Sequence, residues 1–425
     1  MDEAGQTESY LKQSESRGTR LLQIAPFILI ASLYVGARIW HLASACLWFD
    51  EIFSVHAARY NWARMLSFVA ADVVHPPAFY ALLKVWIGIG GESLIWLRLL
   101  PALLSVAAIV PFVLLCRELG VGRGELYLAL LLMAINGYLI KYAQEVRMYS
   151  LLLLLTLTSL WLFVKLLRSE VTSRREILVL FAINLLLVYT HYFGWMVVAL
   201  ESFYLYFRGH TARRRFLLSA ALLLLCFSPW VYAVASAERG QGLAQNIGWV
   251  ARPRAADLAQ FFEMLNEPFY YRQSSAEQPF ALWGLVGSLL LFGLPLIALI
   301  WRELKKSRGE GTVMSGSLLW LLCFSFLPLI LAFALSWVLP QSIWGTRHLI
   351  IVAGPYAILA ALSISRLRPA EAKYTVAILL SSWLFLAGVV MLIRREVNNI
   401  WCAWEQLGVQ ATQGRPRADE TIRVY

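Results

Sequence analysis

Two acidic residues, Asp50 and Glu51, follow the first long apolar stretch of the chain, directly after the aromatic pair Trp48 and Phe49. A carboxylate at this place can take a proton from a hydroxyl nucleophile, provided that the hydroxyl lies within hydrogen-bonding reach. The alternative is helix capping, with Asp50 as the N-cap of a surface helix and Glu51 near the positive end of the helix dipole. The acidic pair alone leaves both interpretations open.

A histidine follows in what the sequence predicts to be a rigid turn, because His75 precedes the paired prolines Pro76 and Pro77. Prolines fix the direction in which the next helix begins, and they remove two amide donors. His75 can donate to a phosphate oxygen or accept a proton, and a solvated turn histidine is the alternative. Asp72 and Tyr80 flank the turn.

A third polar string covers residues 141–149 and contains Lys141, Gln144, Glu145, Arg147 and Tyr149. If the string is helical, Gln144 and Arg147 face one side. In the same helix Lys141 and Glu145 form an i, i+4 pair. Arg147 can hold a phosphate with two parallel hydrogen bonds, although an interfacial arginine beside aromatic anchors is the alternative.

Two further groups of polar residues lie at the ends of apolar segments, His191 in one case and Arg347 with His348 in the other. Ionisable groups near membrane depth are costly, so their position is a guide to function. Several segments that are distant in the chain thus present acids, bases and cations at one depth. This pattern predicts a site at the outer boundary of a membrane.

The composition requires such a membrane. Of the 425 residues, 60% are hydrophobic and 15% are charged, whereas a soluble domain averages about 45–50% apolar and about 25% charged residues. The net charge of +11 lies in short clusters between apolar segments, among them Arg174-Arg175 and Arg213-Arg214-Arg215. Basic clusters at alternate segment ends are typical of cytoplasmic loops, so they indicate membrane topology and exclude a nucleic-acid patch.

The apolar runs predict about eleven transmembrane helices, each long enough to enter a hydrocarbon core of about 30 Å. They are 21–40, 94–116, 124–141, 145–167, 176–190, 193–208, 214–235, 280–301, 315–338, 347–365 and 374–393. The run 76–91 is interpreted as a short helix on the outer face, because a span there would place the basic clusters outside. The N-terminus is then inside the cell and the C-terminus outside.

The expected fold is an all-α integral membrane bundle with juxtamembrane helices on its outer face. It consists of a cytoplasmic tail (1–20), a transmembrane domain (21–394) with outer loops 41–93 and 236–279, and a polar C-terminal tail (395–425). The absence of an obvious targeting signal and the small size favour a bacterial plasma membrane, with the site facing the outside.

These elements, in this order, resemble the GT-C-fold glycosyltransferases that use polyprenyl-phosphate sugars, especially the protein O-mannosyltransferase and lipid A aminoarabinose transferase group. The resemblance covers about residues 20–200, and beyond 210 it lies mainly in the pattern of spans. The matching motifs are Asp50-Glu51, His75-Pro76-Pro77, Arg98-Leu99-Leu100-Pro101, the string 142–149 and, more loosely, Arg347-His348.

The resemblance implies that a sugar moves from a polyprenyl phosphate to a hydroxyl of a lipid, glycan or protein, with Asp50 as general base and Glu51 placing the acceptor. The implied phosphate-binding residues are His75, Lys141, Arg147 and Arg347. The wider substrate site comprises Asp72, Tyr80, Gln144, Glu145, Tyr149 and His191. Lysine stands at the position of His75 in the aminoarabinose enzymes, so the chain departs from that group's pattern here.

No cofactor is expected. Asp50, Glu51, Glu145 and His191 could gather around a divalent cation, but no ligand spacing requires one, and the prediction is that no metal is essential. The expected partners are the polyprenyl-phosphate sugar, the acceptor and membrane lipids.

Three other functions remain open. They are a flippase or transporter of the lipid carrier, a non-catalytic partner of a glycosylation complex, and an O-antigen-ligase-like transferase that uses a diphosphate-linked glycan. A transporter predicts polar groups on both faces and through the midplane, whereas here they gather at one face.

Overall fold

The computed structural model describes residues 24–44, 46–169, 173–208, 211–237, 248, 250–269, 282–310 and 316–393. Within these ranges the chain is helical, and its only β feature is an isolated bridge between Asn136 and Pro268. The two predicted tails and part of the predicted loop 236–279 lie outside the described residues.

A helix at Ile24–Ile39 comes first. It is followed by α2 (Phe49–Arg59), α3 (Trp62–Asp72), α4 (Ala78–Gly90), α5 (Leu94–Ala107), α6 (Ile109–Glu118), α7 (Arg123–Ile135), α8 (Gly137–Ala143), α9 (Tyr149–Arg168), α10 (Arg174–Thr190), α11 (Gly194–Arg208), α12 (Arg213–Ala237), α14 (Ala255–Asn266), α15 (Leu282–Ser288), the π-helix η1 (Leu289–Gly293), α16 (Leu294–Glu310), α17 (Gly316–Val338), the 3₁₀-helix η2 (Thr346–Val352), α18 (Ala353–Ser365) and α19 (Ala370–Ile393).

The all-α membrane fold is confirmed, whereas the count of eleven spans is not. Seven helices among the described residues are long and apolar enough to cross a membrane, and each coincides with an expected span. The other four expected spans are also helical but shorter, at 17 residues for α10 and 15 for α11. The helix Ile24–Ile39 starts at the first described residue, and the expected span 124–141 is divided into α7 and α8.

The division between α7 and α8 falls at Asn136, whose extended backbone ends one helix and begins the next. Its side-chain oxygen accepts from the amide of Leu139, and its amide group donates to the carbonyls of Met264 and Leu265 in α14. The side chain therefore caps α8 and joins it to α14 at the same time. Arg38, fully buried, donates to the last carbonyls of α7 and so stabilises the other side of the break.

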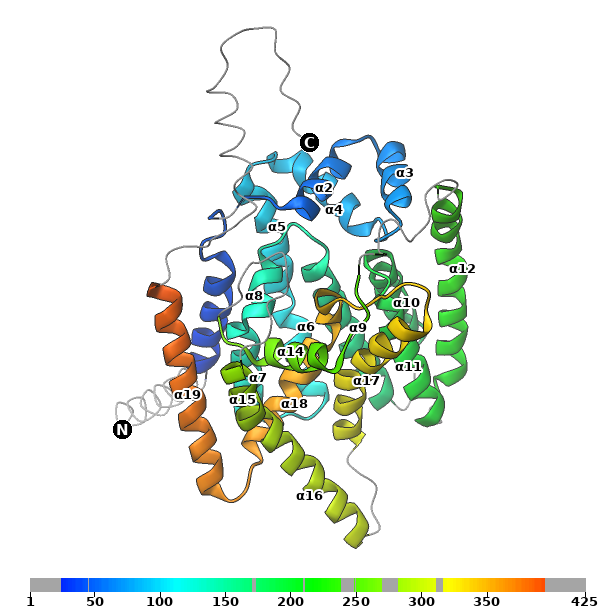
Figure 1. Ribbon diagram of the computed structural model, residues 1–425. Coiled ribbons are helices and arrows are strands. Elements are labelled where there is room, and N and C mark those ends of the chain that lie inside the picture. The colour runs from blue at the N-terminus through cyan, green and yellow to red at the C-terminus, as the bar shows by residue number, and fades with distance from the viewer. Residues whose placement is uncertain are drawn as a thin grey trace, which may run out of the picture.

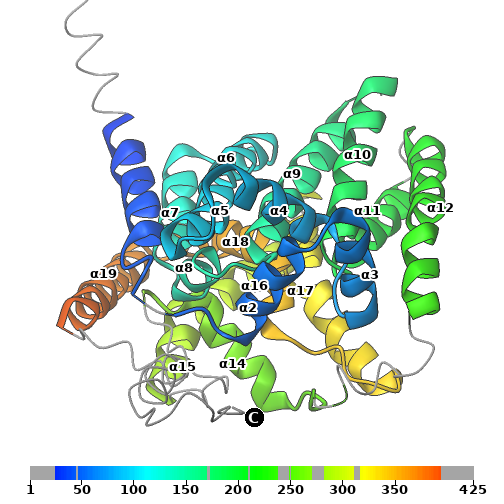
Figure 2. The same ribbon diagram turned by 90° about the horizontal axis from the view of Figure 1, so that it is seen from above.

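Three short helices, α2, α3 and α4, lie together across one end of the bundle (Figures 1 and 2), which we call the α2–α4 end. The run 76–91 belongs to this layer as α4, which packs against α2. The opposite end, which we call the basic end, carries the cationic residues of the helix termini and connecting turns. They are Arg117, Arg123, Arg168, Arg174, Arg175 and Arg213.

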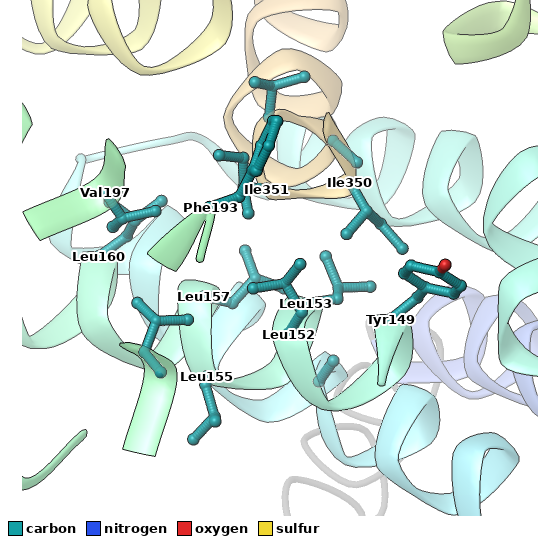
Figure 3. Packing of buried hydrophobic residues seen from close by; sticks show 14 of the residues in the cluster. Tyr149, Leu152, Leu153, Leu155, Leu157, Leu160, Phe193, Val197, Ile350 and Ile351 are labelled. Carbon is teal, nitrogen blue, oxygen red and sulfur yellow. The ribbon is translucent and has the colours of Figure 1, made fainter. Parts of the chain in front are cut away.

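The centre of the bundle is formed by α9 and α18, while α12 and α19 lie at its periphery. In α18 with η2, 89% of the most apolar stretch is buried inside the protein, against 11% in α19. Figure 3 shows leucines of α9, including Leu152 and Leu157, beside Phe193, Ile350 and Ile351. The peripheral helices leave their apolar side chains exposed, which in a membrane means contact with lipid.

A buried polar cluster joins α9, α10 and α11. Ser159 donates to Glu201 at 2.7 Å and contacts Asn184 at 2.5 Å, and Asn184 donates to the other oxygen of Glu201 at 2.9 Å. All three residues are buried. Such hydrogen bonds between helices fix how the helices pack in a membrane, where no water can replace them.

Candidate functional site

Asp50 lies between two arginines at the α2–α4 end. It occupies the first turn of α2, where the helix dipole favours a negative charge. Its Oδ2 accepts a hydrogen bond from Arg347 at 3.0 Å, and a guanidinium nitrogen of Arg147 lies 3.9 Å away. The Asp50 and Arg347 side chains are each 22% exposed and that of Arg147 only 4%. The Asp50 carboxylate therefore lies between a buried arginine, Arg147, and a partly exposed one, Arg347.

Arg147 connects three of the predicted motifs. It donates to the Asp50 carbonyl at 3.1 Å, to the Ser54 hydroxyl at 3.0 Å and to the Tyr80 hydroxyl at 3.4 Å. Its second terminal nitrogen lies 3.3 Å from Nδ1 of His75. The structure therefore brings Asp50, His75, Tyr80 and Arg147 together, although they come from three separate parts of the chain.

Glu51 points away from this cluster. Its carboxylate is fully buried and forms an ion pair with Arg98 at 3.2 Å. It also accepts from the amides of Val146 at 2.8 Å and Trp48 at 3.1 Å. The Trp48 contact caps α2. The expected N-cap at Asp50 is wrong, because Trp48 occupies that position and Asp50 lies in the first turn. In this arrangement Glu51 holds the backbone of the site.

The string 141–149 is not one helix, so the expected common helical face of Gln144 and Arg147 is wrong. α8 ends at Ala143 and α9 begins at Tyr149, and the turn between them directs Gln144 to the carbonyls of Arg38 and Trp40. The amide of Gln144 therefore fastens the turn to the first helix.

The Lys141–Glu145 pair does form, with 3.7 Å between Nζ and Oε1. Burial of Glu145 raises the pKa of its carboxyl to about 7, although Lys141 opposes the shift. Tyr149 is buried, and its ring centroid lies 6.4 Å from that of His348.

Asp72 ends α3 on the other side of the cluster. Burial raises the pKa of Asp72 to about 6, while the charge of Arg147 acts in the opposite direction. The next residue, Val73, has a φ of 66°, in the left-handed region that β-branched residues rarely adopt. Its carbonyl accepts from the Tyr192 hydroxyl at 3.1 Å. This turn places His75 against Arg147.

Three histidines, His75, His191 and His348, face one another beside Arg147. Their ring centroids are 4.6 to 6.1 Å apart. The Nε2 atoms of His75 and His191 and both ring nitrogens of His348 are buried without a hydrogen-bond partner among the described residues. Burial and the charge of Arg147 lower the pKa of His191 to about 3 and that of His75 well below its usual range. His75 and His191 are therefore neutral at pH 7.

The hydrogen bonds fix which nitrogens carry the protons. Arginine can only donate, so Nδ1 of His75 accepts from Arg147 and its Nε2 carries the proton. Nδ1 of His191 accepts from the backbone amide of Phe193 at 3.0 Å, so its Nε2 is also protonated. Two buried N–H groups thus remain unpaired beside two arginines, an environment that suits an oxyanion.

The same assignment disfavours a metal ion at the histidines. The three residues have one nitrogen each within 4.8 Å of the others, which is a spacing that metals use. A metal on Nε2 of His191 would displace the proton that its bond to Phe193 requires, and it would face the charges of Arg147 and Arg347. The set Asp50, Glu51, Glu145 and His191 does not form a ligand group among the described residues. We therefore assign no catalytic role to a metal at these side chains.

One residue of the site, Ser54, was not predicted, and His348 was expected only as part of a polar group at the end of a span. Ser54 lies one turn after Asp50 on α2 and contacts Arg147; its spacing of four residues is a usable signal once α2 is recognised. His348 adjoins Arg347, but in the tight turn of η2 the two side chains diverge, so that Arg347 reaches Asp50 and His348 the histidines.

Neither a protein-family model nor a curated protein matches the sequence. Solved structures do match in fold. The archaeal oligosaccharyltransferase AglB from Archaeoglobus fulgidus, in complex with an inhibitory peptide and a dolichol-phosphate, has 14% sequence identity and a TM-score of 0.54 over 88% of this chain and 55% of its own. The apo form of the A. fulgidus enzyme has 16% identity and a TM-score of 0.50, over 88% and 54% of the two chains.

ArnT from Cupriavidus metallidurans, bound to undecaprenyl phosphate, has 14% identity and a TM-score of 0.46 over 89% and 73% of the two chains. The chain spans about half the length of the archaeal enzymes it matches.

Proposed function

We propose, from the GT-C-like fold that the chain shares with these membrane transferases, that it transfers a sugar from a polyprenyl-phosphate carrier to a hydroxyl of a lipid, glycan or protein acceptor. The observation that carries the proposal is the Asp50 carboxylate between Arg347 and Arg147, because Arg147 also contacts His75, one of two histidines whose Nε2–H groups have no partner among the described residues. A candidate base and a set of candidate anion-binding donors are thus connected through Arg147.

The charges suit this reaction. A polyprenyl-phosphate sugar is a phosphodiester with one negative charge, and its loss of the sugar leaves a phosphate monoester that gains a second. Donors fixed in advance around the place where charge develops stabilise the transition state more than the ground state. Arg147, Arg347, His75 and His191 are such donors. We place the carrier phosphate among them.

The acceptor oxygen would attack the anomeric carbon from the face opposite the phosphate. The bond between this carbon and the phosphate oxygen breaks, its electron pair remains on the phosphate, and the configuration of the sugar inverts. The acceptor hydroxyl gives its proton to Asp50. In the resting site Arg347 forms an ion pair with Asp50; a bound phosphate would compete for this arginine and free the carboxylate to accept a hydrogen bond from the acceptor hydroxyl.

We infer that the α2–α4 end faces the outside of a bacterial plasma membrane. The basic end carries the cationic clusters that cytoplasmic loops favour. Cys46, at the α2–α4 end, is disulfide-bonded, whereas Cys116, Cys226 and Cys323 are free. A disulfide at this end agrees with an oxidising compartment. The partners are then the carrier, its acceptor and membrane lipids.

The test is sugar transfer from a panel of radiolabelled polyprenyl-phosphate sugars by the purified full chain, with crude membranes as the source of acceptor. We expect Asp50→Asn to lower turnover about 10²–10⁴-fold, the usual contribution of a positioned base, while the carrier still binds. Arg147→Ala should weaken carrier binding about 10–100-fold, because it removes hydrogen bonds to a charged group. Glu371→Gln, an exposed carboxylate at the start of α19, is the matched control.

Full turnover by Asp50→Asn would remove Asp50 as the base. Carrier binding without transfer by any form would instead support a flippase or a partner of a glycosylation complex.

A further inference from the structure

A second polar site lies at the basic end, far from Asp50. A cavity of about 690 Å³ opens between α16 and the turn that joins α18 to α19. Figure 1 shows this turn at the end of the bundle opposite α2–α4. Four cationic side chains line the cavity, Arg302, Arg366, Arg368 and Lys373, together with one acidic side chain, Glu303.

Two of these cations are already engaged in holding the fold. Arg302 donates to the Arg366 carbonyl at 2.5 Å, which caps α18, and Arg366 forms an ion pair with Glu125 at 3.0 Å. Arg368 and Lys373 are exposed and take part in none of the ion pairs found among the described residues. The cavity therefore has an excess of positive charge, with two cations available to a ligand.

The helices beside the cavity expose apolar side chains. On α19, Tyr374 and Ile378 are 66% and 65% exposed, and on α16, Ile297 and Trp301 are 62% and 70% exposed. In a membrane these side chains contact acyl chains, and an aromatic residue near a helix end lies at the level of the headgroups. Cations that suit an anionic headgroup thus lie beside an apolar surface that contacts the lipid hydrocarbon.

We propose that this cavity binds the headgroup of an anionic phospholipid in the cytoplasmic leaflet. Arg368 and Lys373 hold the phosphate, and the acyl chains lie along α16 and α19. Ligand sites have volumes of about 300–1,000 Å³, so the cavity is large enough for a headgroup. Basic pockets between transmembrane helices on the cytoplasmic side bind such lipids. The proposal uses the membrane orientation inferred above, but it does not require the transferase activity.

The bound lipid would join α16 to the turn between α18 and α19. α18 packs directly against α16 and continues from η2, which carries Arg347. The lipid would thus hold together the basic ends of α16 and α18, and α18 is preceded by η2, which carries Arg347 into the candidate site.

The test is native mass spectrometry of the purified full chain titrated with phosphatidylglycerol, phosphatidylcholine or inorganic phosphate. We expect phosphatidylglycerol to bind in preference to phosphatidylcholine, and its affinity to fall about tenfold in the double variant Arg368→Gln/Lys373→Gln. Arg174→Gln/Arg175→Gln removes two exposed cations from the same end of the protein and should leave binding unchanged.

An equal loss of affinity in both double variants, or equal binding of the two lipids, would overturn the proposal. Displacement of phosphatidylglycerol by inorganic phosphate at the same concentration would show a free-anion site instead of a lipid site. The charge-preserving variant Arg368→Lys/Lys373→Arg guards against misfolding and should retain the lipid. Because the assay measures binding and no transfer, its failure would not bear on the proposed reaction.

Discussion

At the scale of single residues, the site is arranged around two hydrogen-bond acceptors that already have partners. Nδ1 of His75 faces Arg147 and Nδ1 of His191 faces the Phe193 amide, which leaves both Nε2–H groups without a partner among the described residues. The Phe193 amide and the Arg147 guanidinium thereby fix the tautomers of the two imidazoles. The Nε2–H groups of His75 and His191 can only donate, so a ligand that binds them must be a hydrogen-bond acceptor.

His75→Phe should therefore weaken binding of the polyprenyl phosphate about 10–100-fold, because it removes one hydrogen bond to a charged oxygen while keeping an aromatic ring. Isothermal titration of the carrier in detergent measures the change. His56→Phe, an exposed histidine on α2 that contacts Tyr60, should leave the affinity unchanged. Stoichiometric zinc retained by the wild type and lost in His75→Phe would contradict the proton assignment.

Glu145 predicts a pH dependence of stability. Its folded-state pKa of about 7 exceeds the ordinary value of 4.5, so the folded protein binds this proton more tightly than the unfolded chain does. The stabilisation is complete below pH 4.5 and is lost as the pH rises through about 7. Glu145→Gln should remove this part of the pH dependence, as measured by melting temperature in detergent between pH 5 and pH 8. If the melting temperatures of the wild type and of Glu145→Gln changed with pH in the same way, the prediction would be contradicted.

At the scale of elements, the α2 helix is held to its neighbours by the Glu51–Arg98 pair. The two side chains are 0% and 6% exposed, and removing one partner of a buried pair typically costs about 3–5 kcal/mol. We expect Glu51→Gln to lower the free energy of unfolding by an amount near this range. The exposed pair Arg59–Glu92 is the control, since Glu92→Gln should cost less than about 1 kcal/mol.

The same variant tests whether Glu51 places the acceptor. A role in positioning the backbone predicts a loss of stability together with a loss of turnover. A raised KM for the acceptor in a variant of unchanged stability would support direct contact with the acceptor instead.

The helices themselves were largely predictable, because apolar runs of membrane length are a strong signal, and the seven longest helices coincide with expected spans. The break between α7 and α8, inside one expected span, was not predictable. Asn136 interrupts the apolar run 124–141 where its side chain finds partners on α14, and Gln144 likewise finds partners on and after the first helix. Such contacts join residues more than 100 positions apart, and periodicity within a window of sequence cannot register them.

The candidate site was predictable as a set of residues but not in its geometry. The residue types at segment ends pointed to Asp50, His75, Arg147 and Arg347, which the structure brings together. That Glu51 turns inward, while its neighbour Asp50 does not, depends on where Arg98 lies in the folded bundle. Nothing in the two-residue motif distinguishes its members.

At the scale of the whole molecule, the proposed orientation can be tested directly. Cysteine introduced at Arg59, which is 59% exposed at the α2–α4 end, should react with a membrane-impermeant maleimide in intact cells. Cysteine at Lys305, exposed near the end of α16, should react only after the membrane is permeabilised. The unsubstituted chain corrects for Cys226 and Cys323. The reverse labelling pattern would show the opposite orientation in the membrane, with the candidate site facing the cytoplasm.

The bond between Arg347 and Asp50 joins residues that are 297 positions apart. Asp50 is synthesised early and Arg347 late, so during biogenesis the carboxylate has Arg147 as its cationic neighbour until α17 and η2 have entered the bundle. Closing so long a loop carries an entropic penalty that grows with the logarithm of its length. A chain that stopped before η2 would contain the acidic motif, the proline turn and the histidine at position 191, yet it would lack half of the charge that frames the carboxylate. Activity would thus report that insertion of the polypeptide is complete.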